Sequence, residues 1–144
     1  MLSPITLHYS HMQTKPTTSS LTLTLFEDPI WLPSVQSQLE ILTALPQGWD
    51  AMGSPPVRAD IGEFAINYLL PKIMNDITPA PSLVPVSGGG LQIEWHQNGM
   101  DIELFISGRF ETEFYFSDLE TGEVIEHELV ADFSALEQFI NRLN

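Results

Sequence analysis

The alternation of apolar and polar residues is strongest between positions 91 and 130, where it predicts four consecutive antiparallel strands. Successive side chains of a strand point to opposite faces of its sheet, so this alternation indicates one buried face and one polar face. The four predicted strands are Leu91–Gln97, Met100–Ile106, Phe110–Ser117 and Val124–Val130. Short turn-forming stretches separate them, so each strand is expected to pair with the next in a meander.

The first of these turns, Asn98-Gly99, gives the strongest hairpin signal in the chain. Both central residues of a type I′ turn need positive φ, which asparagine and glycine tolerate best. A two-residue loop then aligns apolar residues on one face and polar residues on the other. The predicted pairs are Leu91–Ile106, Ile93–Leu104 and Trp95–Ile102 on the apolar face, with Glu94–Glu103 and His96–Asp101 on the polar face.

The other two turns extend this register to the remaining strands. We expect a three-residue loop at Ser107-Gly108-Arg109, because a two-residue loop would bring a glutamate onto the apolar face. A four-residue loop is expected between Asp118 and Gly122. These loops predict the pairs Leu104–Thr112, Ile102–Phe114 and Phe116–Ile125 on the apolar face, with Glu103–Glu113, Asp101–Tyr115 and Glu113–Glu128 on the polar face.

In this register the polar face carries two rows of side chains that cross all four strands. One row is Glu94–Glu103–Glu113–Glu128, and the other is His96–Asp101–Tyr115–Glu126. Neighbouring strands lie about 4.8 Å apart, and like charges directly opposite one another destabilise a pair by about 0.2–1 kcal/mol. The glutamate row therefore indicates either a bound cation or basic partner, or the solvated polar face that half-buried sheets commonly have.

Apolar residues at intervals of three and four positions predict three helices, at about 33–45, 57–70 and 132–143. Pro71 is expected to kink or end the second helix near Leu70, since proline lacks an N–H and clashes with the preceding turn. Leu83–Val86 is a candidate edge strand among prolines. The predicted fold class is therefore α+β: a two-layer domain with a four- to five-stranded antiparallel meander and about three helices covering one face.

The beginning of the chain is polar and rich in serine, threonine and proline, which predicts a flexible N-terminal arm at 1–20. Leu21–Leu25 alternates like a short strand that either adds to a sheet edge or remains a tether. The rest, 21–144, is expected to form a single domain that is long enough to bury a core without disulfides or a metal.

A dense cluster of glycines and prolines around Trp49 predicts a structured loop before the second helix. Its structural residues are expected to be Trp49, Asp50, Gly53 and Pro55. Trp49 would close the end of the core, and Asp50 or Ser54 would satisfy N–H groups at the start of the following helix. A binding role for Trp49 and Asp50 stays open, because loops often carry function.

The chain has five Lys+Arg against 19 Asp+Glu, a formal net charge of −14. This charge argues against nucleic acid and anionic membranes as partners, since both need clustered cations. It suits a basic protein partner, and it equally suits a charge that only maintains solubility. The absence of cysteine excludes disulfides and zinc–thiolate sites. No signal peptide or membrane span is predicted, so we expect a cytoplasmic protein.

The sequence contains no motif of Walker A loops, zinc proteases, α/β-hydrolases or EF-hands, and no cofactor is expected. One constellation of reactive side chains remains on the first hairpin: Glu94, His96, Asp101 and Glu103. These residue types suit a hard divalent cation or acid–base chemistry, so a metal-dependent enzyme is an alternative. An open sheet face is, however, unlike the concave pockets that such sites usually occupy.

The favoured interpretation is a non-enzymatic acidic module that docks a basic protein on its polar sheet face. The predicted partner-binding residues are Glu94, Asp101, Glu103, Glu113, Tyr115, Glu126 and Glu128. Antitoxin, immunity and inhibitor roles fit a small, acidic, cysteine-free domain by analogy. An accessory subunit of a larger complex is a further alternative, and the sequence is compatible with a homo-oligomer.

Two stretches also resemble a family of small bacterial proteins. They are Gly48-Trp49-Asp50 with Gly53-Ser54-Pro55-Pro56, and the run Gly89–Trp95. The family has a W-D-x-x-G-[AS]-x-x-P loop before a helix and a G-G-x-Q-[IVL]-E-W strand after a proline-rich connector. The resemblance covers roughly positions 45–130 and implies a bacterial source and a shared fold. That family carries no assigned activity, so the resemblance assigns no functional residue.

Overall fold

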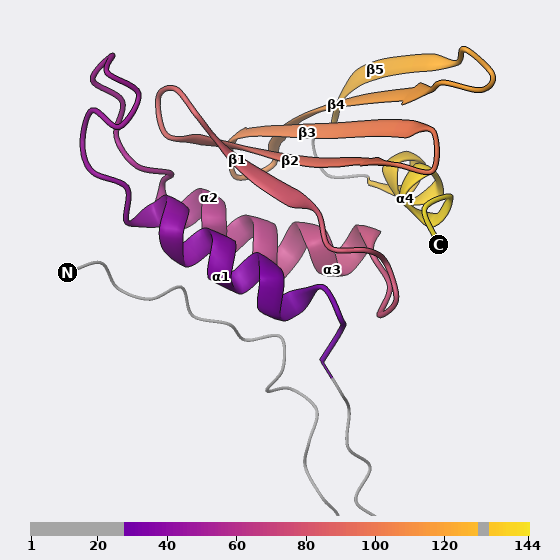
Figure 1. Cartoon of the computed structure of the whole chain (residues 1–144), viewed down its shortest axis with the longest axis horizontal. Helices are drawn as coiled ribbons and strands as arrows, with labels where there is room; N and C mark the ends of the chain where they lie inside the picture. The colour runs from indigo at the N-terminus through magenta and orange to yellow at the C-terminus, as the bar shows by residue number, and fades with distance from the viewer. Residues whose placement is uncertain (1–27, 130–132) are drawn as a thin grey trace, which may run out of the picture.

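The computed structural model describes residues 28–129 and 133–144, which form an antiparallel sheet with helices on one face (Figure 1). The elements in chain order are α1 (Leu32–Thr43), α2 (Ala59–Phe64), the π-helix η2 (Ala65–Leu69), α3 (Leu70–Ile73), β1 (Ser82–Val86), β2 (Gly90–Gln97), β3 (Met100–Gly108), β4 (Glu111–Asp118), β5 (Val124–Leu129) and α4 (Ser134–Asn141). The strands lie in the order β1-β2-β3-β4-β5. This arrangement confirms the predicted fold class. The predicted arm at 1–20 and the strand-like Leu21–Leu25 lie outside the described residues.

The hydrophobic core lies between the sheet and the helices. Alternation along β2 and β3 turns every second side chain toward the helices, and burying one such side chain contributes about 1.5–3 kcal/mol. The fully buried residues that the two layers contribute include Leu91, Ile93 and Ile102 from the sheet and Val35, Leu39, Ile61, Ile66 and Leu69 from the helices. The opposite side of the sheet, which we call the outer face, has no described helix over it (Figure 1).

The terminal helix α4 covers the inner side of the sheet near β4. The ring of Phe139 stacks on Phe116 with centroids 4.2 Å apart, and Arg142 donates to the Asp118 carboxylate at 2.6 Å. Asn98, in the first hairpin turn, donates from Nδ2 to the carbonyl oxygen of Leu143 at 3.1 Å. The cationic Arg142 is therefore engaged on the helical side of the molecule, away from the outer face.

The first hairpin has the predicted register. Asn98 and Gly99 occupy the turn with φ of 55° and 71°, and every predicted pair between β2 and β3 occurs. The last turn was also predicted correctly, since Phe116 pairs with Ile125 and Glu113 with Glu128.

The predicted register between β3 and β4 is wrong by two residues. Ile102 pairs with Phe116 instead of Phe114, because the loop has two residues and Gly108 pairs with Glu111. A β-bulge between Ile106 and Gly108 inserts one extra residue, which keeps the apolar positions of both strands on the inner side.

Because of this shift in register, neither of the two predicted rows forms on the outer face. Glu103 lies opposite Tyr115, and Glu113 lies opposite Phe105. The rows across the strands are Glu94–Glu103–Tyr115–Glu126, Gln92–Phe105–Glu113–Glu128 and His96–Asp101–Ser117–Val124. Aromatic residues therefore interrupt the line of carboxylates, and among the described side chains Glu94 and Glu103 are the carboxylates that lie directly opposite each other.

Of the two outcomes expected at Pro71, an end of the second helix near Leu70 does not occur: the helix changes to π geometry at Ala65–Leu69 and continues through Pro71 to Ile73. The amide of Leu70 donates to the carbonyl of Ala65, five residues back, which is the π pattern. Proline has no N–H to donate and its ring clashes with the carbonyl four residues back in an α-helix. The wider π turn directly before Pro71 accommodates that ring, so the helix passes through it.

Candidate functional site

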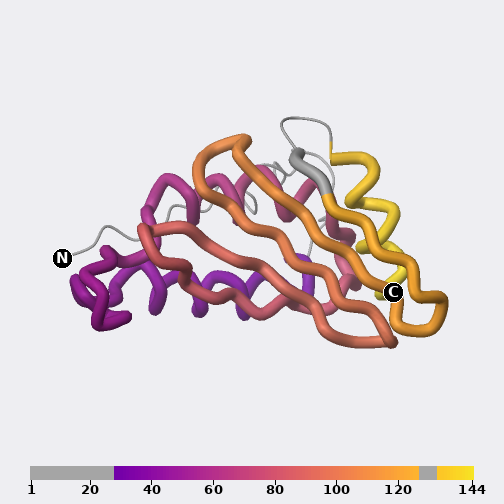
Figure 2. The backbone as a smooth tube through the Cα atoms, turned by 90° about the horizontal axis from the view of Figure 1, so that it is seen from above, coloured from indigo at the N-terminus to yellow at the C-terminus, as the bar shows by residue number. Residues whose placement is uncertain are grey.

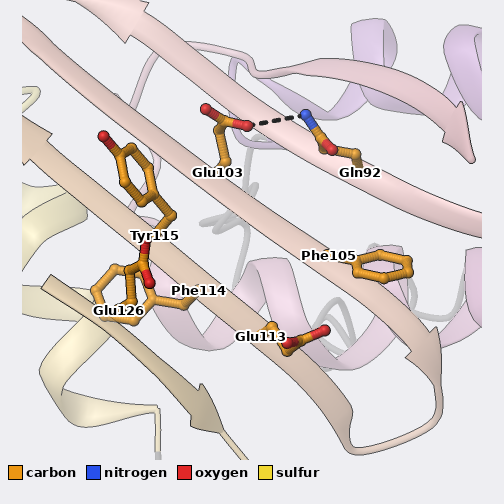
Figure 3. A pocket seen from close by; sticks show the side chains of 7 residues that line it. All are labelled: Gln92, Glu103, Phe105, Glu113, Phe114, Tyr115 and Glu126. Atoms are coloured by element: carbon orange, nitrogen blue, oxygen red, sulfur yellow. Dashed lines mark hydrogen bonds between the residues drawn. The ribbon is translucent and has the colours of Figure 1, made fainter.

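The candidate site is a hollow at the centre of the outer face, about 460 Å³ in volume. Its lining residues come from all four strands β2 to β5 and are Gln92, Glu103, Phe105, Glu113, Phe114, Tyr115 and Glu126 (Figure 3). Phe105 and Tyr115 are half-buried, and their rings stand among the carboxylates. The hollow is thus an aromatic surface with acidic side chains around it.

The position of Phe105 depends on a glycine in the neighbouring strand. A Cβ added to Gly90 would lie 3.0 Å from the ring carbon Cε1 of Phe105 and 3.1 Å from the carbonyl oxygen of Ile106. Such distances are below normal packing contact, so a side chain at position 90 would push the ring away. Glycine at this position lets the ring of Phe105 lie against the backbone at the edge of the hollow.

Gln92 separates the two glutamates that face each other on β2 and β3. Its Nε2 donates to Oε2 of Glu94 at 2.7 Å and to Oε1 of Glu103 at 3.1 Å. The amide offsets part of the repulsion between the two carboxylates, but it is neutral and leaves both negative charges in place.

His96 lies beside the hollow, in contact with two carboxylates. Its Nδ1 is 2.7 Å from Oδ1 of Asp101, and its Nε2 is 3.5 Å from Oε1 of Glu94. The hydrogen bond with Asp101 raises the pKa of His96 above its ordinary value of 6.5, and the charge of Glu94 adds to this effect. The two carboxylates therefore stabilise the imidazolium form of His96 more than water stabilises that of a free histidine.

The other carboxylates of the face have no cationic neighbour in the described structure. Glu103, Glu113 and Glu126 form no ion pair with a lysine or arginine among residues 28–129 and 133–144. The arginine pairs that do occur join Arg58 to Asp60 and Arg142 to Asp118 and Glu123. The negative charge around the hollow is consequently not neutralised by the described part of the chain.

The structure does not assemble the four proposed metal ligands into a site. Within the described ranges, no group of three or more His, Asp or Glu side chains is placed to hold a metal ion. Asp101 is bonded to His96 and Glu103 to Gln92, so these oxygens are already engaged. This geometry gives the metal-dependent alternative no support.

The loop at 48–56 is held by Asp50. Oδ1 of Asp50 accepts hydrogen bonds from the amides of Met52 and Ser54 at 3.0 and 3.1 Å. Oδ2 accepts from the hydroxyls of Ser54 at 2.6 Å and Ser87 at 3.0 Å. These bonds, that from the Ser54 hydroxyl first, hold the pKa of Asp50 well below its usual range. Asp50 therefore fastens the loop to itself and to the turn before β2.

Two details of the predicted loop differ in the structure. The N-cap residue of α2 is Arg58, and no side chain caps that helix, so neither Asp50 nor Ser54 has the predicted capping role. Trp49 is half-buried and does not belong to the core, and its indole donates to the carbonyl of Pro55 at 2.7 Å. Gly53 has φ of 83°, which favours glycine.

Sequence reasoning missed Gln92, Phe105 and Phe114 as members of the site. Phe105 carried a detectable signal, since it is an apolar residue at a polar position of the alternation. The role of Gln92 as a shared donor depends on side-chain geometry that the sequence does not contain. Among the predicted site residues, the structure places Glu103, Glu113, Tyr115 and Glu126 on the hollow, and Glu94 and Asp101 beside His96. The backbone of Glu128 lies opposite that of Glu113.

No helix in the part of the chain that the structure describes is both long and apolar enough to cross a membrane. Comparison of the chain with protein-family models, curated proteins and solved structures gave no match. The resemblance to a bacterial family therefore stays a prediction, and the functional argument depends on the geometry of the outer face.

Proposed function

We propose that the protein is a non-enzymatic binding module that docks a basic protein partner on its outer face. The observation that carries this proposal is the hollow itself, where Glu103, Glu113 and Glu126 surround Phe105 and Tyr115 without a lysine or arginine of the described chain among the lining residues. Because the predicted row of four glutamates does not exist, the proposal depends on this combination of acidic and aromatic side chains.

The chemistry of the hollow matches arginine and lysine side chains. An arginine stacks on an aromatic face by cation–π attraction and donates paired hydrogen bonds to a carboxylate. Aromatic residues are enriched in the buried centre of protein interfaces, among the residues that contribute most of the binding energy. The net charge of −14 would also steer a basic partner toward this surface and accelerate association.

Antitoxin, immunity and inhibitor roles are the functions of this type that we propose, since each consists of covering a surface of another protein, which here would be a basic one. They follow from the surface chemistry and from analogy, because a fold of this class supports many functions. The partner would have to present exposed arginine or lysine side chains on a surface that fits an open sheet.

Charge reversal on the outer face tests the proposal. The variant with Glu103→Lys and Glu113→Lys should capture at least tenfold less of the basic partner from an extract of the native host, because two attractive contacts become repulsive. A matched variant with Glu40→Lys and Glu137→Lys, both exposed on helices, changes the net charge equally and should capture the partner almost normally. Undiminished capture by the first variant, or equal loss in both, would contradict docking at this face.

A further inference from the structure

A second hollow, separate from the outer face, lies where the β3–β4 turn meets the helix formed by α2 and η2. Its volume is about 290 Å³, and its lining residues are Asp60, Glu63, Phe64, Asn67, Tyr68 and Arg109. Figure 2 shows the turn between β3 and β4 reaching over this helix. Small-molecule sites range from roughly 300 to 1,000 Å³, so this hollow suits only a small ligand.

Three irregularities of the backbone converge on this hollow. They are the π-helix Ala65–Leu69, the bulge between Ile106 and Gly108, and Phe110 with φ of 61°. The Phe110 ring is 5.1 Å from Phe64 and 4.9 Å from Tyr68, centroid to centroid, and these contacts hold the turn against the helix. π turns, bulges and left-handed non-glycine residues all concentrate at functional sites.

The lining of the hollow includes one cationic and one anionic side chain that have no ion-pair partner in the described part of the chain. Neither Arg109 nor Glu63 forms an ion pair with another residue of the described ranges. Asp60 differs, because Nη2 and Nε of Arg58 donate to its two oxygens at 2.6 and 3.1 Å. Arg109 comes from the strand turn and Glu63 from the helix, so the two free charges stand on different elements.

We propose that this hollow binds a small zwitterion of the amino acid type. Its carboxylate would accept paired hydrogen bonds from Arg109, and its ammonium group would donate to Glu63. An apolar side group would lie against the half-buried ring of Tyr68. A ligand with only one charged group would pair with either Arg109 or Glu63 and leave the other side chain unpaired. Recognition therefore needs both charges on the ligand. This proposal is independent of partner docking on the outer face.

The probes that test this proposal are L-phenylalanine, 2-phenylethylamine and 3-phenylpropionate, titrated into the full chain and followed by NMR shifts of the amides at 60–68 and 108–111. L-phenylalanine should bind saturably. The amine lacks the carboxylate and the acid lacks the ammonium group, so each should bind at least about tenfold more weakly, which is the usual effect of one charged hydrogen bond. The absence of saturable L-phenylalanine binding at millimolar concentration would overturn the proposal.

Two variants test which side chain contacts which charged group of the ligand, and each variant is a control for the other. Arg109→Gln should remove the preference for L-phenylalanine over the amine and retain the preference over the acid. Glu63→Gln should have the opposite pattern, and Glu40→Gln, which removes an exposed charge from α1, should retain both preferences. If Arg109→Gln and Glu63→Gln each retain both preferences, or each lose both equally, then Arg109 does not bind the carboxylate and Glu63 does not bind the ammonium group as proposed.

Discussion

At the scale of single residues, the outer face is stabilised without losing its negative charge. Gln92 donates to Glu94 and Glu103 at 2.7 and 3.1 Å, which reduces repulsion between directly opposed carboxylates. His96 performs a related role at the edge, where it contacts Asp101 at 2.7 Å. These contacts offset part of the repulsion within the face, and the carboxylates of Glu113 and Glu126 have no ion-pair partner in the described structure and are available to a partner.

The contact with Asp101 predicts a pH dependence for His96. Because the folded-state pKa is raised above 6.5, this pair stabilises the fold fully below pH 6.5 and ceases to do so as pH rises through the raised pKa. The imidazole is about half exposed, at 48%, so solvent screening keeps the contribution to stability small. The sensitive measurement is an NMR titration of the His96 ring protons.

Asp101→Asn should lower the pKa of His96 toward 6.5, because the variant loses the charged acceptor that contributes most to the shift. Glu40→Gln, which removes a charge from α1 instead, should leave the titration unchanged. A His96 pKa at or below 6.5 in the unmodified protein would show that the contact with Asp101 does not persist in solution.

At the scale of secondary-structure elements, the edge strand β1 is closed to further pairing. Pro81 and Pro85 have no N–H, and the amide of Leu83 between them donates to Oε1 of Gln38 at 2.8 Å. The Nε2 of Gln38 donates in turn to the carbonyl of Pro81 at 3.0 Å. Prolines and covering side chains are the usual means by which sheet edges avoid pairing with other chains.

Gln38→Leu should destabilise the fold by about 1–2 kcal/mol, because it leaves the Leu83 amide without a partner at a partly buried edge. Denaturant unfolding gives the free energy, and hydrogen exchange should become faster at the Leu83 amide. Gln36→Leu is the control, since Gln36 lies on the same helix and has no hydrogen bond to another described residue. Equal stability of the Gln38 variant and the unmodified protein would mean that the edge does not need this cover.

The elements also show which parts of the fold the sequence determines locally. The Asn98-Gly99 hairpin was predicted correctly because two residues fix the turn and the alternation of both strands then leaves one register. The β3–β4 register was missed because the bulge and the positive φ of Phe110 depend on packing against Phe64 and Tyr68. Asp50 was assigned to the wrong partners for a similar reason, since Ser87 is remote in sequence.

At the scale of the whole molecule, charge is distributed unevenly between the two sides. The described arginine and lysine residues contact the helical side or lie in turns: Arg58 pairs with Asp60, Lys72 lies over the ring of Tyr68, Arg142 pairs with Asp118, and Arg109 lies in the β3–β4 turn. The outer face has carboxylates and aromatic rings instead. Such separation gives the molecule one strongly acidic side, which favours fast, salt-sensitive association with a basic partner.

Site-specific photocrosslinking in the native host tests the central claim most directly. Tyr115 would be replaced by the photoreactive amino acid benzoylphenylalanine, and Ile41, which is 65% exposed on α1, would be replaced in a control variant. We predict that position 115 forms a covalent adduct with a basic protein and that the adduct disappears when Glu103→Lys and Glu113→Lys are added. An adduct from position 41 with none from position 115, or one from position 115 that persists after charge reversal, would contradict partner docking on the outer face.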